Sequence, residues 1–125
     1  KLSQFKKGNT DEINQSISCK LEHYLMSNPY NNKGFNLSKM AFDLKLSERV
    51  LSNYFNTELV MSFSEWKNNL RIDYACALID EGKVNKLTVE GISLNVGFSS
   101  RSKFIDAFKT RKGVTPSVYI KQTKN

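Results

Sequence analysis

Apolar residues recur every three or four positions along most of this chain, and that spacing restricts the chain to helical architectures. The pattern is clearest near the N-terminus, where every fourth residue is apolar at Ile13, Ile17, Leu21 and Leu25. No stretch shows a convincing alternation of apolar and polar residues, which is the pattern of a half-buried β-strand. The sequence therefore predicts an all-α fold.

Capping and breaking residues divide the chain into helices. Pro29 ends the first helix, because the residue before a proline disfavours helical backbone. Ser47 and Thr88 stand where N-caps are needed, and Gly113 can take the left-handed conformation that closes a helix. The seven predicted helices cover residues 13–28, 36–44, 47–55, 62–82, 88–96, 100–110 and 115–120. Residues 1–12 are polar and without periodicity, so we expect a flexible linker from an upstream region.

The charge of the chain indicates a polyanionic partner. Its 125 residues include 19 lysines and arginines against 12 acidic residues, which gives a formal net charge of +7. Most of the excess lies in the second half, and seven basic side chains between residues 99 and 125 accompany a single acid, Asp106. No apolar run approaches the roughly 18 residues of a membrane span. Because the chain does not begin with methionine, we expect it to be a fragment of a longer protein.

The sequence argues against metal binding and catalysis. Cys19 and Cys76 lie far apart and accompany only one histidine, His23, so they lack the number and spacing of zinc ligands. We expect both cysteines to be buried or half-buried thiols in a reducing cytoplasm. The chain also lacks clustered carboxylates, a glycine-rich phosphate loop and a nucleophile motif. We therefore expect no enzyme activity, no metal and no cofactor.

Two stretches, residues 37–55 and 89–108, repeat one pattern of a short helix, a tight break and a second helix. The matching positions are Ala41 with Ser93, Leu44 with Val96, Lys45 with Gly97, and Leu46 with Phe98. A small residue lets two helices cross closely, and the next matched positions supply a turn and a buried apolar residue, as in a helix-turn-helix motif. Either copy alone could be an ordinary helical hairpin. Two copies around one long helix, residues 62–82, predict a homeodomain-like tandem.

The segment at residues 87–119, LTVEGISLNVGFSSRSKFIDAFKTRKGVTPSVY, resembles the C-terminal signature of the AraC/XylS family of transcription regulators. The shared features are the Gly-Phe turn, the Phe-x-x-x-Phe-Lys helix and the Gly-x-Thr-Pro-x-x-Tyr ending. Upstream, residues 37–55 and 63–78 fit the family's first helix-turn-helix and linker helix. The resemblance implies an AraC-type DNA-binding domain at residues 13–125, with a first lobe at 13–61, a linker helix at 62–82 and a second lobe at 83–125.

The resemblance implies that two recognition helices enter successive major grooves of the DNA and read its sequence. A linker helix of about 18 residues spans on the order of 27 Å, comparable with the roughly 34 Å repeat of B-DNA. The implied partners are double-stranded DNA, RNA polymerase and an upstream sensor or dimerisation region. The phrases Asn28-Pro29-Tyr30 and Leu87-Thr88 also resemble versions that end membrane-anchored hybrid sensor kinases of gut Bacteroidetes. The alternative is a degenerate helix-turn-helix module that serves protein–protein interaction.

The family's base-facing positions can be transferred to individual residues of this sequence. They are Arg49, Ser52 and Asn53 in the first recognition helix, and Arg101, Ser102, Lys103 and Asp106 in the second. Arginine can bond guanine, asparagine adenine, and aspartate the N4 amine of cytosine. Solvated side chains on a helix face are the alternative for each. The resemblance also implies phosphate contacts by Lys109 and Lys112, and for Arg71 either a phosphate contact or a bracing role.

Two residues depart from the family pattern. Lys45 occupies a turn position where the family usually has glycine, and a left-handed conformation there would cost roughly 1 kcal/mol. Asp106 replaces a residue that is more often basic or small, and its carboxylate would repel phosphate unless it meets a donor base. The large aromatic residues are expected in the core, and they are Trp66, Phe98, Phe104, Phe108 and Tyr119.

Overall fold

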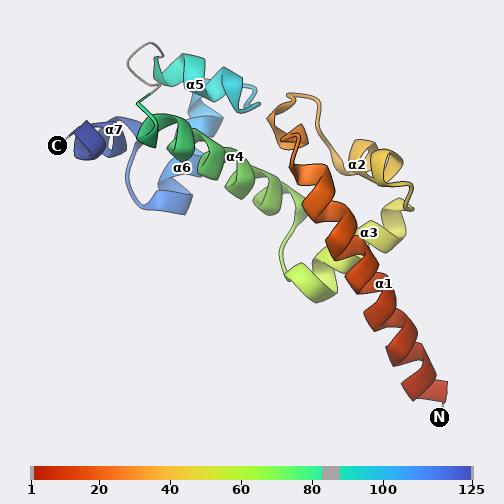
Figure 1. The fold of residues 1–125 in the computed structure, drawn as a ribbon. Helices are drawn as coiled ribbons and strands as arrows, with labels where there is room; N and C mark the ends of the chain where they lie inside the picture. The colour runs from red at the N-terminus through yellow and green to blue at the C-terminus, as the bar shows by residue number, and fades with distance from the viewer. Residues whose placement is uncertain (1, 83–87, 125) are drawn as a thin grey trace. The chain divides into compact units, whose positions relative to one another are not determined.

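The computed structural model describes residues 2–82 and 88–124, and these residues form helices without any β-strand (Figure 1). The seven α-helices are α1 (Leu2–Leu25), α2 (Leu37–Leu44), α3 (Glu48–Tyr54), α4 (Phe63–Asp80), α5 (Val89–Asn95), α6 (Arg101–Lys112) and α7 (Pro116–Lys124). A 3₁₀ turn, η1 (Pro29–Asn31), follows α1, and a π-helix, η2 (Phe55–Leu59), follows α3. The predicted all-α fold with seven helices is confirmed.

Helix α1 begins earlier than the apolar periodicity predicts. It starts at Leu2, so it runs through most of residues 1–12, the segment that we expect to be a flexible linker from an upstream region. Adding a residue to an existing helix costs far less than starting a new one, and residues 2–12 contain no proline to stop the extension. A connection to an upstream region stays a prediction.

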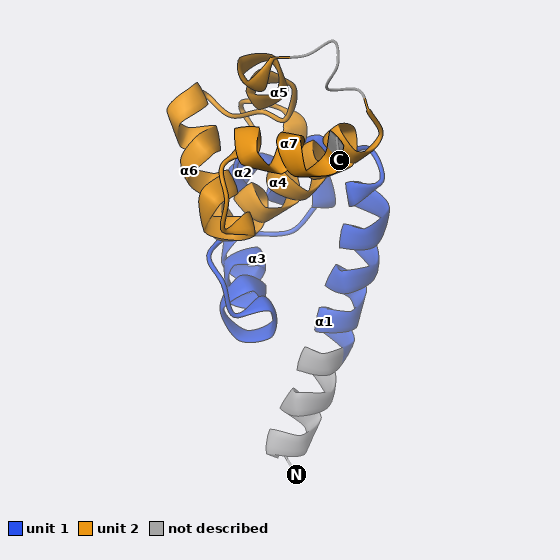
Figure 2. Cartoon of the chain, turned by 90° about the vertical axis from the view of Figure 1, so that its left-hand side faces the viewer, with its two compact units in different colours: residues 1–29, 36–62 blue, residues 30–35, 63–125 orange. Residues whose placement is uncertain are grey.

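The chain divides into two compact units (Figure 2). The first contains residues 1–29 and 36–62, and the second contains residues 30–35 and 63–125. The second unit begins its main segment at Phe63, where α4 starts, and α4 packs against α6 and α7. The helix predicted to link two lobes is therefore part of the core of the second.

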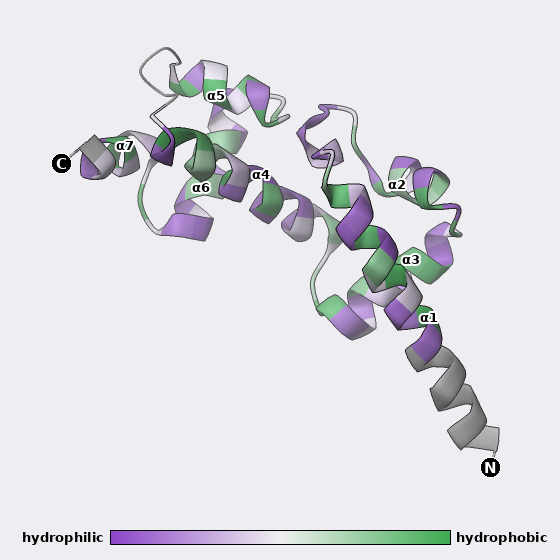
Figure 3. Ribbon diagram, viewed as in Figure 1, coloured by the Kyte–Doolittle hydropathy of each residue, from purple (hydrophilic) through white to green (hydrophobic). Residues whose placement is uncertain are grey.

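The core of the first unit is built from the apolar stripes of α1, α2 and α3 (Figure 3). Its buried side chains are Ile17, Leu21, Met40, Ala41, Leu44, Leu51, Tyr54 and Phe55. Two residues expected to be inward or buried, Val50 and Cys19, are exposed. Val50 directly precedes the buried Leu51, and Cys19 lies two residues from the buried Ile17 and Leu21. Residues one or two positions from a buried residue of a helix point in other directions, so both side chains face away from the core.

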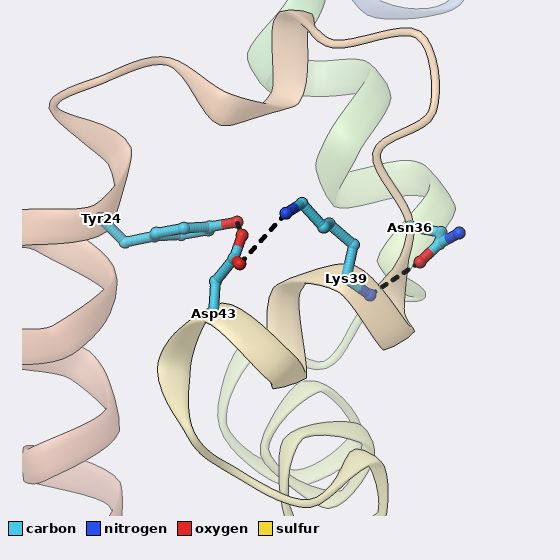
Figure 4. Close-up of polar contacts among 4 residues, drawn as sticks. All are labelled: Tyr24, Asn36, Lys39 and Asp43. Carbon is cyan, nitrogen blue, oxygen red and sulfur yellow. Dashed lines mark hydrogen bonds and ion pairs between the residues drawn. The ribbon is translucent and has the colours of Figure 1, made fainter.

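A polar chain of contacts joins α1 to α2 in this unit (Figure 4). The Tyr24 hydroxyl donates to Asp43 at 2.7 Å, Lys39 pairs with the same carboxylate at 3.3 Å, and Asn36 caps the backbone N–H of Lys39 at 2.8 Å. Burial and the bond to Asp43 raise the pKa of Tyr24, while the Tyr24 bond lowers the pKa of Asp43. The contacts fix the start of the first helix-turn-helix.

The second unit is built around a row of aromatic rings. Phe98, Phe104, Phe108 and Tyr119 follow one another edge to face, with ring centroids 5.5, 5.8 and 5.5 Å apart. The first three are buried and Tyr119 is half-buried, with its hydroxyl donating to Asp80 on α4. The core prediction is confirmed for the three phenylalanines. Trp66 is only half-buried, against Phe63 at 5.8 Å between ring centroids.

Candidate nucleic-acid interface

The turn before α3 has the left-handed backbone that the sequence pattern predicts. Lys45 lies at φ 59° and ψ 41°, and the next backbone N–H, that of Leu46, donates to Ala41 at 2.9 Å. Ser47 then caps α3, its hydroxyl accepting from the Val50 N–H at 3.1 Å. A lysine side chain in this conformation costs roughly 1 kcal/mol relative to glycine, so the turn is formed at some expense of stability.

Helix α3 presents the three predicted residues of the first lobe together. Leu51, Tyr54 and Phe55 pack inward, so the helical repeat leaves Arg49, Ser52 and Asn53 exposed on the opposite face. With Val50 and Asn56 these three residues line a shallow hollow of about 490 Å³. Val50, at 39% exposed, contributes an apolar patch to this surface instead of entering the core.

The turn before α6 depends on a glycine that no other residue can replace without movement. Gly97 has φ +95°, and a Cβ added there would lie 2.7 Å from the backbone oxygen of Asn31. The small Ser93 next to this turn is buried, and its hydroxyl donates to the Ser100 carbonyl at 3.3 Å. Ser100 caps α6 by accepting from the Lys103 N–H at 3.2 Å. These contacts set where α6 begins.

Helix α6 is the predicted second recognition helix. Phe104 and Phe108 anchor it in the core, and the predicted residues Arg101, Ser102, Lys103 and Asp106 are all exposed. Ser102, Asp106 and Lys109 follow at intervals of four and three, so they share one face of the helix. Lys112, in the last turn, is exposed as well. The structure therefore keeps the predicted positions of both lobes accessible.

An ion pair on the side of α6 holds it against α4. Arg111 donates from Nε and Nη2 to the two carboxylate oxygens of Asp73, at 3.2 and 2.9 Å. This two-pronged bond raises the pKa of Arg111 and adds a polar contact between α6 and α4 to the packing of the buried Phe104 and Phe108. Arg111 is therefore engaged within the protein, and Lys109 and Lys112 remain the basic residues of that turn that point to solvent.

In the described part of the chain, Asp106 forms no ion pair with Lys109, which follows it by three residues on the same helix. The backbone oxygen of Asp106 accepts from the Thr110 hydroxyl at 2.9 Å, and its side chain lies in a hollow between α6 and α4. The simplest alternative for this aspartate, an intrahelical charge partner, is thus absent.

Arg71 acts as a brace within the second unit. Its side chain is only 4% exposed, and Nε and Nη2 donate to the backbone oxygens of Tyr30 and Asn32 at 2.6 and 2.9 Å. Its guanidinium also lies 5.4 Å from the centre of the Phe98 ring. Burial lowers the pKa of Arg71. These contacts favour the bracing role over a phosphate contact.

Neither a metal-binding cluster nor a helix able to cross a membrane occurs in the described residues, 2–82 and 88–124. They contain no group of three or more His, Cys, Asp or Glu side chains placed to hold a metal ion. None of their helices has the length and apolar character that crossing a membrane requires.

Two helices that each follow a tight left-handed turn, and that each turn a polar face to solvent, define a tandem helix-turn-helix domain. The family model described as "Helix-turn-helix domain" matches residues 40–122 of the chain. The chain therefore belongs to this family. Its relatives include the arabinose operon regulatory protein of Escherichia coli, 24% identical over 115 residues, which cover 87% of this chain and 38% of that protein, and the predicted resemblance is confirmed.

Three similar proteins illustrate the relationship. The virulence regulon transcriptional activator VirF of Yersinia enterocolitica is 33% identical over 85 residues, 68% of this chain. The chain spans only about 30% of the length of VirF. A transcriptional regulator with an AraC-type DNA-binding domain from Chromobacterium violaceum has a TM-score of 0.71 at 22% identity, covering 86% of this chain and 94% of that one.

The third is the DNA-binding domain of AdpA, described as a global transcriptional factor and solved in complex with a target DNA. Its TM-score is 0.68 at 15% identity, and the match covers 90% of this chain and 92% of that chain. At these identities the two structural matches establish the fold.

Proposed function

We propose that the chain is the DNA-binding part of a transcription regulator and binds duplex DNA sequence-specifically, with α3 and α6 in successive major grooves. The observation that carries this proposal is the paired exposure of Arg49, Ser52 and Asn53 on α3 and of Arg101, Ser102, Lys103 and Asp106 on α6. Each set follows a tight turn that fixes its helix. Side chains of these types can read base edges, and the positive net charge favours association with DNA.

Roles at the phosphate backbone fall to other residues in this proposal. Lys109 and Lys112 are exposed at the end of α6 and contact phosphates there, whereas Arg71 serves as the brace. Catalysis is not expected. In the whole protein, the domain is the output of an upstream sensor or dimerisation region, acts with RNA polymerase, and works in the cytoplasm, including where a membrane anchor lies upstream.

The test is selection of duplexes from a random library, followed by footprinting on the selected sequence. We expect protection on one face of the duplex that extends beyond a single helical turn. Protection of about 5 base pairs would mean that one recognition helix alone engages. Failure to enrich any duplex, with the protein folded, would contradict the proposal and favour the protein-interaction alternative.

A further inference from the structure

The second unit contains a hollow between α4, α6 and the turn before α6. Its volume is about 380 Å³, and it is open to solvent on one side. The residues that line it are Lys33, Lys67, Asn68, Arg71, Gly97, Phe98, Ser99, Lys103, Asp106, Ala107 and Thr110. On α6 the lining positions recur at intervals of three and four, so one face of the helix forms this wall. We refer to it as the α4/α6 hollow.

Positive charge dominates the α4/α6 hollow. Four of its lining residues are cations and one, Asp106, is an acid, so the charge around the hollow stays net positive even though that carboxylate repels an anion. Arg71 is already bonded to backbone oxygens, but Lys33, Lys67 and Lys103 form no ion pair with any acid in the described residues. Three ammonium groups around one hollow repel one another, and an anion that entered it would relieve that repulsion.

Among the three lysines that line this hollow, Lys67 is the least exposed. It is half-buried on α4, and its ammonium lies 5.7 Å from the centre of the Phe63 ring. Burial, followed by the positive charges of Arg71 and Lys103, lowers the pKa of Lys67. Lys67 thus bears an electrostatic penalty that an incoming negative charge would offset.

The position of the hollow indicates which anion would meet it. A helix with its side chains is about 10–12 Å across, and the major groove is about 12 Å wide, so a recognition helix fills the groove. Elements beside the helix then face the sugar-phosphate strands. Helix α4 packs against α6, and Lys67 on α4 lines the hollow between them.

We propose that the α4/α6 hollow seats one phosphate group of the DNA backbone, with Lys67 as its central cation and Lys33 beside it. This inference rests on the proposed function and adds to it a phosphate contact from outside the recognition helix. Neither Lys33 nor Lys67 was among the residues expected from the sequence. The alternative source of the same chemistry is a free phosphate ion, which would need no duplex.

The experiment compares the salt dependence of duplex binding by the 125-residue chain and by four variants, one of which, Lys33→Met, changes a second residue of the hollow. Lys67→Met removes the charge and keeps an apolar side chain over Phe63, whereas Lys67→Arg keeps the charge. Lys121→Met is the control, because it makes the same charge change at an exposed residue of α7. Affinities for a selected duplex and a random duplex are measured at 50 and 200 mM salt. Circular dichroism establishes that each variant is folded.

We expect Lys67→Met to weaken binding to both duplexes by the same factor and to flatten the salt slope by about 0.9. Its loss of affinity should then be about 3.5-fold larger at 50 mM than at 200 mM salt. Lys67→Arg and Lys121→Met should keep the wild-type slope. Lys33→Met, a change at an exposed residue of the same hollow, should flatten the slope in the same direction even if Lys67→Met fails to fold.

Three results would overturn the inference. Unchanged slopes for folded Lys67→Met and Lys33→Met, with wild-type protein still binding duplex, would refute the phosphate seat alone. Binding of inorganic phosphate that Lys67→Met abolishes, with the duplex slope unchanged, would assign the hollow to a free anion. Absence of duplex binding by the wild-type protein would refute the proposed function and the inference together.

Discussion

The Nε atom of Arg71 donates to the backbone oxygen of Tyr30 at 2.6 Å, across 41 positions of sequence. The same guanidinium donates to Asn32, and the neighbouring Asn31 carbonyl lies against Gly97. Within the second unit, one buried side chain on α4 therefore holds residues 30–32 close to the turn that positions α6. Loss of the guanidinium would leave two carbonyl groups without their charged donor.

Replacing Arg71 should destabilise the protein more than replacing Arg111, the arginine that pairs with Asp73. We expect Arg71→Met to lower the free energy of unfolding by about 2–4 kcal/mol, because the carbonyl oxygens of Tyr30 and Asn32 lose their charged donor, the first of them in a buried hydrogen bond. Arg111→Met, which breaks an exposed pair, should cost no more than about 1 kcal/mol. Urea unfolding of both variants makes the comparison. Equal losses would contradict the brace.

Two glycines with left-handed backbone provide a matched pair. Gly97→Ala should destabilise the domain by about 2–4 kcal/mol, because the new methyl group meets the Asn31 carbonyl in addition to the backbone strain. Gly113→Ala, where nothing lies within 4 Å, should cost only the strain of about 1 kcal/mol. Thermal unfolding of the two variants measures the difference. A similar loss of stability at both positions would mean that the Asn31 backbone shifts to accommodate the added methyl group.

The left-handed lysine before α3 offers a stabilising change. We expect Lys45→Gly to raise the free energy of unfolding by about 0.5–1 kcal/mol, since glycine adopts this backbone without the Cβ penalty. Lys45→Ala removes the same side chain but keeps the Cβ, so it should give no such gain. If both variants gain equally, the lysine charge and not its backbone conformation is responsible.

Base reading and phosphate contact should separate at the two ends of α6. Arg101→Ala should weaken binding to a selected duplex by about 1–3 kcal/mol and weaken binding to random duplex less. Lys112→Ala should reduce both affinities alike and flatten the salt slope by about one unit. Titration of both duplexes at several salt concentrations tests this. Equal losses on the two duplexes for Arg101→Ala would remove it from the base-reading residues.

Asp106 should lower the affinity for random duplex and increase sequence selectivity. Its carboxylate repels phosphate and accepts only from donor groups such as the N4 amine of cytosine, so Asp106→Ala should raise affinity for random duplex and relax preference at one position. Glu12→Ala, which makes the same charge change at an exposed residue of α1, is the control. Both affinities are measured at one fixed salt concentration. An unchanged ratio of selected to random affinity would show that Asp106 is only a solvated charge.

The features that sequence predicts well here are local ones. Asn36, Ser47, Thr88 and Ser100 cap their helices as side-chain acceptors for backbone N–H groups three residues ahead. Such a cap needs only a short stretch of chain, so its residues are visible in the pattern. The exposed faces of α3 and α6 follow in turn from the spacing of their buried residues.

The features that sequence did not predict depend on contacts between distant residues. Nothing near residues 30–35 indicates that they pack with α4, because their partner, Arg71, comes many residues later. Lys33 and Lys67 appear unremarkable in the sequence for the same reason, since only the folded unit places them around one hollow. The π-helix η2 also has no clear pattern in the residues that form it.

The placement of residues 30–35 has a consequence for dividing this protein. Its second unit is assembled from two separate stretches of chain, with the ends of α1 and α2 flanking the shorter one. A polypeptide that begins at Phe63 would therefore carry Arg71 without the carbonyls it binds, and Gly97 without the backbone that it accommodates. A chimera that takes its second unit from a relative must therefore include residues 30–35 of that relative together with α4 to α7.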